Sequence, residues 1–392
     1  MDFQLSDDQR ALRSGMRDLL DAVFDRHRMR AAVERGGTLD RSLWRELGAV
    51  GFFALRLPEE AGGVGLGMPE AVLLFEEAGR ALLPGPLVAT HLAAGLVKGA
   101  AEGEAVVTAV DGGLPVAHLT EADAVLVGAD ALVGEPLRAF VAAARPVRSM
   151  DPLTPLHRTG TAGVGAGTAG VAGVAGVATG PAGARAVAGP AGVRAVAGPA
   201  DARAVAGPAD ARAVAGPAGA RAATERTTAH AERIRFEGAL LTAAEQLGSA
   251  ARTTETAVQH AGDREQFGSP IGSFQAVKHL CADMLARTEP ARAAVYAAAV
   301  TGDPVEIAAA KLLADEAAVR NARDCLQIHG GMGFTWEADV HLHLKRAWLR
   351  SAARLSGTAA EELLAAGLGA ARPYHGSSAA PGRGAPEAGG GG

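Results

Sequence analysis

Hydrophobic residues recur at helical spacing from the start of the chain. Leu12, Met16 and Leu19 repeat at intervals of three and four, which predicts an amphipathic helix. Ser6 and Gln9 precede this pattern with the spacing of a capping box, so the helix is expected to begin just after Ser6. The chain therefore opens on a helix with one apolar face.

The same periodicity predicts two further helices within the first hundred residues. They fall in RSLWRELGAVGF (residues 41–52) and MPEAVLLFEEAGRALL (residues 68–83). The glycine-rich stretch LPEEAGGVGLG (residues 57–67) between them misses the G-x-G-x-x-G spacing and has no lysine after it. We interpret it as a loop between helices rather than as a phosphate loop.

The pattern changes between residues 105 and 150. Short β-branched runs such as AVVTAV (residues 105–110) and AVLVGADALV (residues 124–133) alternate with Gly, Asp and Pro. Such runs are typical of strands. We expect a small antiparallel β region here.

A low-complexity segment follows from about residue 160. Arginines recur in it every nine residues, at Arg185, Arg194, Arg203, Arg212 and Arg221. A calcium-binding β-helix also has a nine-residue period, but its paired glycines are missing from these copies. Side chains this small bury too little surface to offset the entropy of ordering, so residues 160–224 are expected to form a flexible insertion. Its arginines either keep the segment solvated or contact an acidic surface.

Helical periodicity returns at Thr227 and continues to the end of the pattern near residue 368. Candidate boundaries of these helices are Ser273 as an N-cap, Asp303 with Pro304 as a second start, Trp336 to Leu355 as a helix, and Thr358 with Glu361 as a capping box. The layout is helices, a small β region and a helical bundle.

Composition and charge exclude several classes of protein. The net charge is 38 − 43 = −5, which does not favour nucleic acid as a partner. Cys281 and Cys325 have neither zinc-ligand spacing nor a disulfide framework, and this suits a reducing cytoplasm. The N-terminus does not resemble a signal peptide, and no run approaches the roughly 20 apolar residues of a membrane helix. We expect a cytoplasmic protein that does not insert into membranes.

The stretch QIHGGMGFTWEADVHLHLKR (residues 327–346) carries candidate chemistry. His341 and His343 are two residues apart and point to separate faces of a helix, so they cannot readily chelate one metal ion, and no metal site is predicted. Gly330 and Gly331 permit positive φ and offer backbone N–H groups to an anionic or polar ligand. A glycine after a helix can equally be a simple C-cap.

A second stretch, DREQFGSPIGSFQ (residues 263–275), combines a cation, an aromatic ring and an amide. Arg264 provides a fixed charge suited to a diphosphate, Phe267 an apolar face, and Gln275 an amide that can read a base edge. Taken one at a time, these residues fit a surface arginine and a core phenylalanine equally well. Their occurrence together indicates a ligand site.

These stretches resemble a known family. REQFGSPIGSFQAVKHLCADM and LQIHGGMGFTWEADVHLHLKRA look like the paired C-terminal signature of the acyl-CoA dehydrogenases, and LSDDQRALRSGMRDLL with LGAVGFFALRLPEEAGGVGLG resembles their N-terminal domain. The resemblance implies a mainly α fold with a small β-domain. The expected parts are an N-terminal helical domain (1–100), a reduced β-domain (101–159), the insertion (160–224), a C-terminal four-helix bundle (225–372) and a disordered tail (373–392).

The family binds FAD at a contact between protomers. The resemblance implies that one protomer contacts the FAD diphosphate and adenine and that its neighbour completes the site, with Trp336 and the histidines packing the helix that follows. The cofactor-binding residues expected on this basis are Arg264, Phe267 and Gln275 from one protomer, and Gln327 and Gly331, beside Gly330, from the other.

The family's reaction is removal of an α-proton by a carboxylate while hydride leaves to the flavin. Here Ser356 stands in the segment LSGT where the family commonly has the catalytic glutamate. Some members carry the base on the first bundle helix instead, and that place falls at Gly238, next to Glu237. Glu237 is the candidate base, although a one-residue offset turns it about 100° around the helix.

Three functions are compatible with this pattern. The first is FAD-dependent α,β-dehydrogenation of an acyl-CoA by a homo-oligomer, either a dimer or a tetramer. The second is a non-catalytic subunit that provides half of the FAD site in a heterotetramer with a paralogous subunit. The third is a helical scaffold that binds no flavin.

Overall fold

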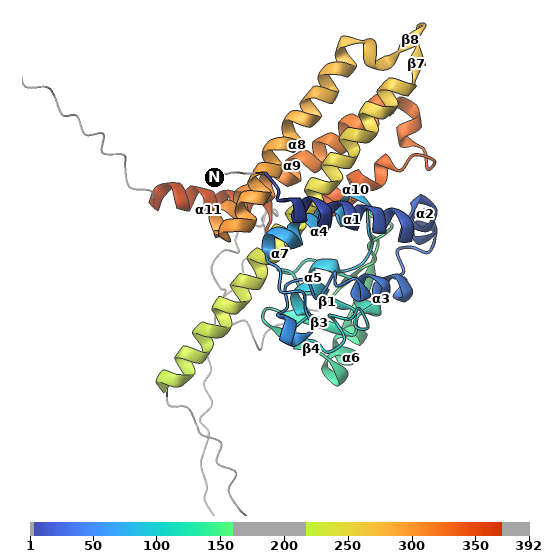
Figure 1. Cartoon of the computed structure of the whole chain (residues 1–392). Coiled ribbons are helices and arrows are strands. Elements are labelled where there is room, and N and C mark those ends of the chain that lie inside the picture. The colour runs from blue at the N-terminus through green and yellow to red at the C-terminus, as the bar shows by residue number, and fades with distance from the viewer. Residues whose placement is uncertain (1–3, 160–216, 371–392) are drawn as a thin grey trace, which may run out of the picture.

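The computed structural model describes residues 4–159 and 217–370 (Figure 1). The segment that carries most of the nine-residue repeats and the C-terminal tail lie outside these residues. The expected flexibility of both therefore stays a prediction. In the described part, helices from the two ends of the chain pack together and the small strands lie to one side of them.

The N-terminal region is helical, as its periodicity predicts. Its elements are α1 (Asp7–Val23), α2 (Arg26–Glu34), α3 (Arg41–Ala49), the 3-10 helix η1 (Glu59–Ala61), α4 (Met68–Arg80) and α5 (Leu87–Ala93). The capping box at the start of α1 is confirmed, because Ser6 and Gln9 each bond the other's backbone N–H at 3.1 Å. The glycine-rich stretch before α4 forms η1 and turns, which confirms the loop.

The middle region contains two small sheets. The first has the order β1 (Val107–Ala109), β3 (Ala124–Val127), β4 (Asp130–Leu132), and the second has the order β2 (Val116–Ala117), β6 (Leu156–Arg158), β5 (Arg145–Val147). Pairing is antiparallel for β3/β4, β2/β6 and β5/β6, as expected, but β1 and β3 are parallel. The connection between them passes through β2 and the 3-10 helix η2 (Leu119–Glu121), which is long enough for a crossover.

A helix in this region was not predicted. α6 (Gly134–Ala143) lies between β4 and β5 and buries Leu137 and Phe140 against Val125 and Leu119. The sequence favoured strands throughout because Gly134 and Pro136 look like breakers. Pro136 falls in the first turn of the helix, where its missing N–H costs nothing.

The C-terminal region is a bundle of long helices, which confirms the expected architecture. It contains α7 (Pro217–Asp263), a hairpin of β7 (Glu265–Gln266) and β8 (Ser269–Pro270), the 3-10 helix η4 (Ile271–Ser273), α8 (Gln275–Thr301), α9 (Pro304–His329), the 3-10 helix η5 (Gly330–Phe334), α10 (Val340–Ala352) and α11 (Gly357–Ala370). Asp303 caps α9 as predicted, accepting from the N–H groups of Val305 and Glu306.

Four predicted boundaries are wrong. Phe274, not Ser273, is the N-cap of α8, because η4 already includes Ser273. The last helix begins at Gly357 after Ser356 rather than at Thr358, and α10 begins at Val340 rather than at Trp336. α7 also starts at Pro217, ten residues before the predicted start at Thr227, so residues 217–224 belong to a helix.

The N-terminal helices and the bundle share one core. Gly79 of α4 and Gly248 of α7 let the two backbones approach so closely that a Cβ at Gly248 would lie 1.8 Å from the Glu76 carbonyl oxygen. Arg346 of α10 pairs with the fully buried Asp151 and donates to the Leu83 carbonyl oxygen at 3.1 Å. These contacts fix the middle region and α4 against the bundle.

Long helices raise the question of a membrane span. Within residues 4–159 and 217–370, no helix is both long and apolar enough to cross a bilayer.

Candidate functional site

The hairpin after α7 exposes an arginine and a phenylalanine. The Arg264 N–H donates to the His260 carbonyl oxygen at 2.9 Å, which ends the helix. Phe267 and Gly268 form the two-residue turn between β7 and β8, with φ of +55° and +76°. Positive φ suits glycine but strains phenylalanine. Phe267 nevertheless stays 92% exposed, with its ring edge-to-face against Phe274 at 6.1 Å.

Arg264 and Gln275 lie close to this aromatic pair. Gln275 is the first residue of α8, directly after Phe274, and its side chain is exposed. The Arg264 guanidinium is also exposed, and in the described part of the chain it has no ion-pair partner. A free guanidinium beside an exposed ring is chemically suited to an anionic group attached to an aromatic system.

The second motif ends α9. Gln327 is exposed in the last turn of α9, and its carbonyl oxygen accepts from the Gly330 N–H. Gly330 has φ of +61°, and open space surrounds the Cβ position of both Gly330 and Gly331. These two glycines leave room for another molecule to approach the backbone.

A histidine pair joins the two motifs. The rings of His260 on α7 and His329 on α9 stack with centroids 4.0 Å apart and an interplanar angle of 14°. Burial, and then the charge of the neighbouring His329, lowers the pKa of His260. Arg264 is one helical turn from one ring and Gly330 follows the other, so the structure brings the two predicted motifs to the same end of the bundle within one chain.

Several apolar side chains surround this end. The exposed fractions are 58% for Met332, 75% for Phe334 and 61% for Trp336. Trp336 contacts His341 edge-to-face and lies under the Lys345 ammonium at 4.6 Å, so it packs only in part. Exposed apolar side chains gathered at one place are typical of an interaction surface.

The two histidines of α10 have separate surroundings. His343 is buried and its Nδ1 lies 2.8 Å from the Ser249 hydroxyl. His341 contacts Trp336 and Lys345 instead. Burial is the main cause that lowers the pKa of His343 to about 3 and that of His341 to about 4. Their different neighbours agree with the predicted separation of the two side chains.

A cavity of about 510 Å³ lies beside the histidine pair. His260, His329 and Met332 contribute to its lining, together with residues of α1 and α2 such as Leu20 and Arg26. Its volume is within the roughly 300–1,000 Å³ of ligand sites. The end of the bundle that carries both motifs thus borders open space as well as packed core.

The candidate base Glu237 is held by an arginine. Both Glu237 carboxylate oxygens accept from Arg56, at 2.9 and 3.1 Å, and the Glu237 side chain is 19% exposed. Arg233 lies farther from the carboxylate, at 3.8 Å. The bidentate guanidinium occupies both carboxylate oxygens, so neither is free to contact a substrate while the pair is intact.

The two other places considered for a base carry no carboxylate. A Cβ at the buried Gly238 would meet the Cδ of Arg354 and the Cδ1 of Leu92, both at 3.4 Å. The Ser356 hydroxyl accepts from the Ala359 N–H at 3.4 Å, which is an N-cap contact for α11. Ser356 therefore has a structural role in this fold.

Arg354 and Arg56 were missed in the sequence. Arg354 has φ of +66°, and its backbone N–H donates to the Asp111 carboxylate of the middle region. Arg56 reaches Glu237 from the turn before η1. Nothing in the local sequence marks either residue, because both contacts depend on tertiary packing.

Comparison with family models covers both ends of the chain. The model of the acyl-CoA dehydrogenase N-terminal domain matches residues 6–102, and that of the acyl-CoA dehydrogenase C-terminal domain matches residues 236–360. The matched segments include both motifs at the end of the bundle.

Two mycobacterial proteins are similar over most of their length. The acyl-CoA dehydrogenase IpdE2 of Mycobacterium tuberculosis is 32% identical over 328 residues, which cover 81% of this chain and 84% of that protein. IpdE2 of Mycolicibacterium smegmatis is 31% identical over 369 residues, which cover 92% of this chain and 97% of that protein.

Solved structures share the fold at low identity. A glutaryl-coenzyme A dehydrogenase in complex with glutaryl-CoA superposes with a TM-score of 0.69 and 18% identity, covering 94% of this chain and 97% of its own. The ChsE4–ChsE5 complex of Mycobacterium tuberculosis gives 0.66 and 22% identity, with coverage of 94% and 99%.

Proposed function

The chain belongs to the acyl-CoA dehydrogenase family, and from this premise we propose that it works in FAD-dependent α,β-dehydrogenation of an acyl-CoA as one subunit of a pair, with a related subunit supplying the catalytic base. The enzyme class is an oxidoreductase acting on the CH–CH bond of an acyl-CoA thioester, with FAD as its cofactor. The finer assignment, a paired subunit, depends on the residues near Glu237.

The end of the bundle fits the part of FAD that carries the diphosphate and adenine. Arg264 would contact the diphosphate, Phe267 would cover an apolar surface, and Gln275 would bond a base edge. In a neighbouring protomer, Gln327, Gly330 and Gly331 would offer an amide and backbone N–H groups to the same cofactor. When bound, FAD supplies the acceptor for the hydride that leaves the β-carbon.

The ion pair between Arg56 and Glu237 carries the proposal of a paired subunit. To act as a base, Glu237 would have to leave a bidentate contact, and the freed Arg56 would lose its partner. Gly238 and Ser356 cannot replace it, because neither has a basic side chain. The α-proton is therefore assigned to a carboxylate outside this chain, and this chain contributes cofactor contacts.

The partner is expected to be another member of the same family. The ChsE4–ChsE5 structure is titled as a complex of two differently named chains, and it has the same fold as this protein. The exposed Phe334, Trp336 and Phe267 at the motif end of the bundle provide apolar surface for such a contact. A homo-oligomer with Glu237 as its base is the alternative.

Absorption spectra distinguish the two assignments. We expect the chain expressed alone to be pale and inactive, and to gain flavin and activity when co-expressed with a homologue from the same genome. In that complex, Glu237→Gln should leave bleaching by acyl-CoA unchanged, as should the exposed control Glu232→Gln on the same helix.

Three outcomes would contradict a paired subunit. One is a yellow chain that bleaches with acyl-CoA when expressed alone. Another is loss of bleaching in Glu237→Gln but not in Glu232→Gln. The last is faster bleaching in Arg56→Met, which frees Glu237 and would identify it as the base.

A further inference from the structure

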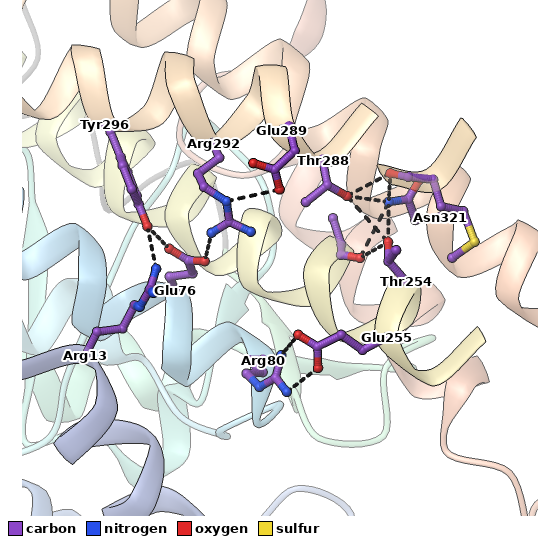
Figure 2. A network of polar contacts seen from close by, with 12 residues as sticks. Arg13, Glu76, Arg80, Thr254, Glu255, Thr288, Glu289, Arg292, Tyr296 and Asn321 are labelled. Carbon is purple, nitrogen blue, oxygen red and sulfur yellow. Dashed lines mark hydrogen bonds and ion pairs between the residues drawn. The ribbon is translucent and has the colours of Figure 1, made fainter. Parts of the chain in front are cut away.

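A second cavity lies between helices of the N-terminal region and the bundle. It shares Arg17 and Arg80 with the cavity beside the histidine pair, but none of the predicted cofactor residues lines it. Its volume is about 380 Å³, within the roughly 300–1,000 Å³ of ligand sites. Residues from α1, α4, α7 and α8 line it: Arg13, Arg17, Glu76, Arg80, Gly248, Ala251, Glu255 and Arg292. Figure 2 labels five of these side chains: Arg13, Glu76, Arg80, Glu255 and Arg292.

The lining is rich in arginine. Among the described residues, the cavity wall contains four arginines and two glutamates. Just outside the lining, Glu77 accepts from Arg17 at 2.6 and 2.8 Å, and Glu289 lies 3.4 Å from Arg292. Counted with these two, the glutamates number four and balance the four arginines, so the attraction for an anion depends on Arg13, which has no carboxylate partner among the described residues.

Arg13 makes one weak contact. Its Nη1 lies 3.4 Å from the Tyr296 hydroxyl oxygen, and Tyr296 donates to Glu76 at 2.6 Å (Figure 2). Burial, and then the charge of Glu76, raises the pKa of Tyr296 to about 12, so the phenol stays protonated. The remaining N–H groups of Arg13 are available to a ligand, since a guanidinium has five donors.

The other arginines are fixed in position. Arg292 pairs with Glu76, and Arg80 pairs with Glu255 (Figure 2). Each pairing uses only part of a guanidinium, and the remaining donors are held without further loss of side-chain entropy. On α7, the lining residues Gly248 and Ala251 have little or no side chain, which leaves space between the arginines.

We propose that this cavity binds a small oxyanion of the phosphate class, with Arg13 of α1 and Arg292 of α8 donating to it from opposite helices. A tetrahedral oxyanion has enough acceptors to take donors from both helices, and guanidinium groups match phosphate geometry well. The guanidinium donors that the ion pairs leave unused attract the anion, while Glu76 and Glu255 keep Arg292 and Arg80 in place. The site is separate from the cofactor residues.

Calorimetric titration of the full chain with inorganic phosphate tests the site, with ionic strength held constant by chloride. Saturable binding is expected, and Arg13→Gln should weaken it roughly tenfold or more because it removes charge-assisted hydrogen bonds. Arg10→Gln, on the same helix but outside the cavity lining and paired with Asp7, should bind as the unchanged chain does. Ala251→Glu places a carboxylate into the cavity and should abolish binding.

Titrations with two other anions identify the chemical class of ligand that the cavity binds. Glycerol phosphate tests a phosphomonoester, and succinate tests a carboxylate. Arg264→Ala should retain phosphate binding, because Arg264 belongs to the cofactor motif. The proposal is wrong if phosphate binds no better than chloride, if only succinate binds, if Arg13→Gln equals Arg10→Gln, or if Arg264→Ala alone removes binding. None of these results depends on flavin or on catalysis.

Discussion

The imidazole of His260 stacks on that of His329 with 4.0 Å between ring centroids. This contact joins the last turn of α7 to the last turn of α9. It holds the hairpin that carries Arg264 beside the glycines that follow α9, so the two motifs keep their relative position within one chain. The cofactor site that we propose between protomers would need such fixed surfaces, since each protomer would have to present both motifs in register.

Arg264→Ala is expected to lower the flavin content of whichever assembly holds FAD. Its guanidinium has no ion-pair partner among the described residues, so its removal leaves no buried charge behind. Loss of one charge-assisted contact should weaken flavin binding by about 1.5–3 kcal/mol. The ratio of flavin absorbance to protein absorbance measures it. Arg320→Ala, which removes an i, i+4 pair with Glu316 on α9, is the control and should keep its flavin.

Phe267→Gly should have opposite effects on the stability of the fold and on cofactor binding. Glycine adopts φ of +55° without strain, so the variant should be more stable by about 1 kcal/mol. Flavin content should fall, because the exposed ring is lost. Chemical denaturation and absorbance report the two effects, with Phe267→Tyr as the control that keeps the ring. A Phe267→Gly protein that retains all its flavin would exclude a role for this ring.

Gly248→Ala is expected to destabilise the fold. A Cβ there would lie 1.8 Å from the Glu76 carbonyl oxygen, so α4 would have to move away from α7 at a cost of about 1–3 kcal/mol. Gly262→Ala on the same helix has open space around its Cβ and should raise stability by about 0.5–1 kcal/mol. Denaturant midpoints compare the two. Equal effects in both variants would contradict the close approach of α4 and α7.

His343 should make stability depend on pH. Burial lowers the pKa of His343 from 6.5 to about 3, so the unfolded chain takes up a proton at a higher pH than the folded chain does. The stability that His343 contributes is present above pH 6.5 and is lost as the pH falls toward 3, at up to about 1.4 kcal/mol per pH unit. Glu245 and Asp315 act in the opposite sense, because burial raises the pKa of both carboxyl groups.

A substitution separates the contribution of His343 to the pH dependence of stability from that of the carboxyl groups. His343→Gln should lose less stability than the unchanged chain when denaturation at pH 7 is compared with denaturation at pH 5. The exposed His27→Gln is the control and should follow the unchanged chain. The assignment fails if His343→Gln is as acid-sensitive as the unchanged protein.

Local patterns predicted the helical elements well. The contacts of Ser6, Gln9 and Asp303 involve residues within four positions, so their spacing alone contains the information. The end of α9 at Gly330 follows from the same local rule, because only glycine accepts its positive φ without strain. The resemblance that identified both motifs rests on sequence alone. The shared site that it implies between protomers stays a prediction, whereas the proximity of the motifs within one chain comes from the structure.

Contacts between segments that are far apart in the chain could not be predicted from the sequence. Arg56 and Glu237 are far apart in the chain and meet only after α4 and α5 pack on α7, so the candidate base looked free. Ser356 shows the opposite case, because its contact is local but Thr358 with Glu361 offered a competing capping pattern. A competing local signal accounts for the wrong start of α11, and contacts between distant segments account for the missed Arg56 and Arg354.

Arg346 joins all three parts of the described fold through Asp151 of the middle region and the Leu83 carbonyl oxygen next to α4. Breaking this junction would leave an unpaired buried charge on either side, so we expect the three parts to melt together in a single cooperative transition. A polypeptide nicked by protease between residues 159 and 217 would consequently migrate as one particle under native conditions.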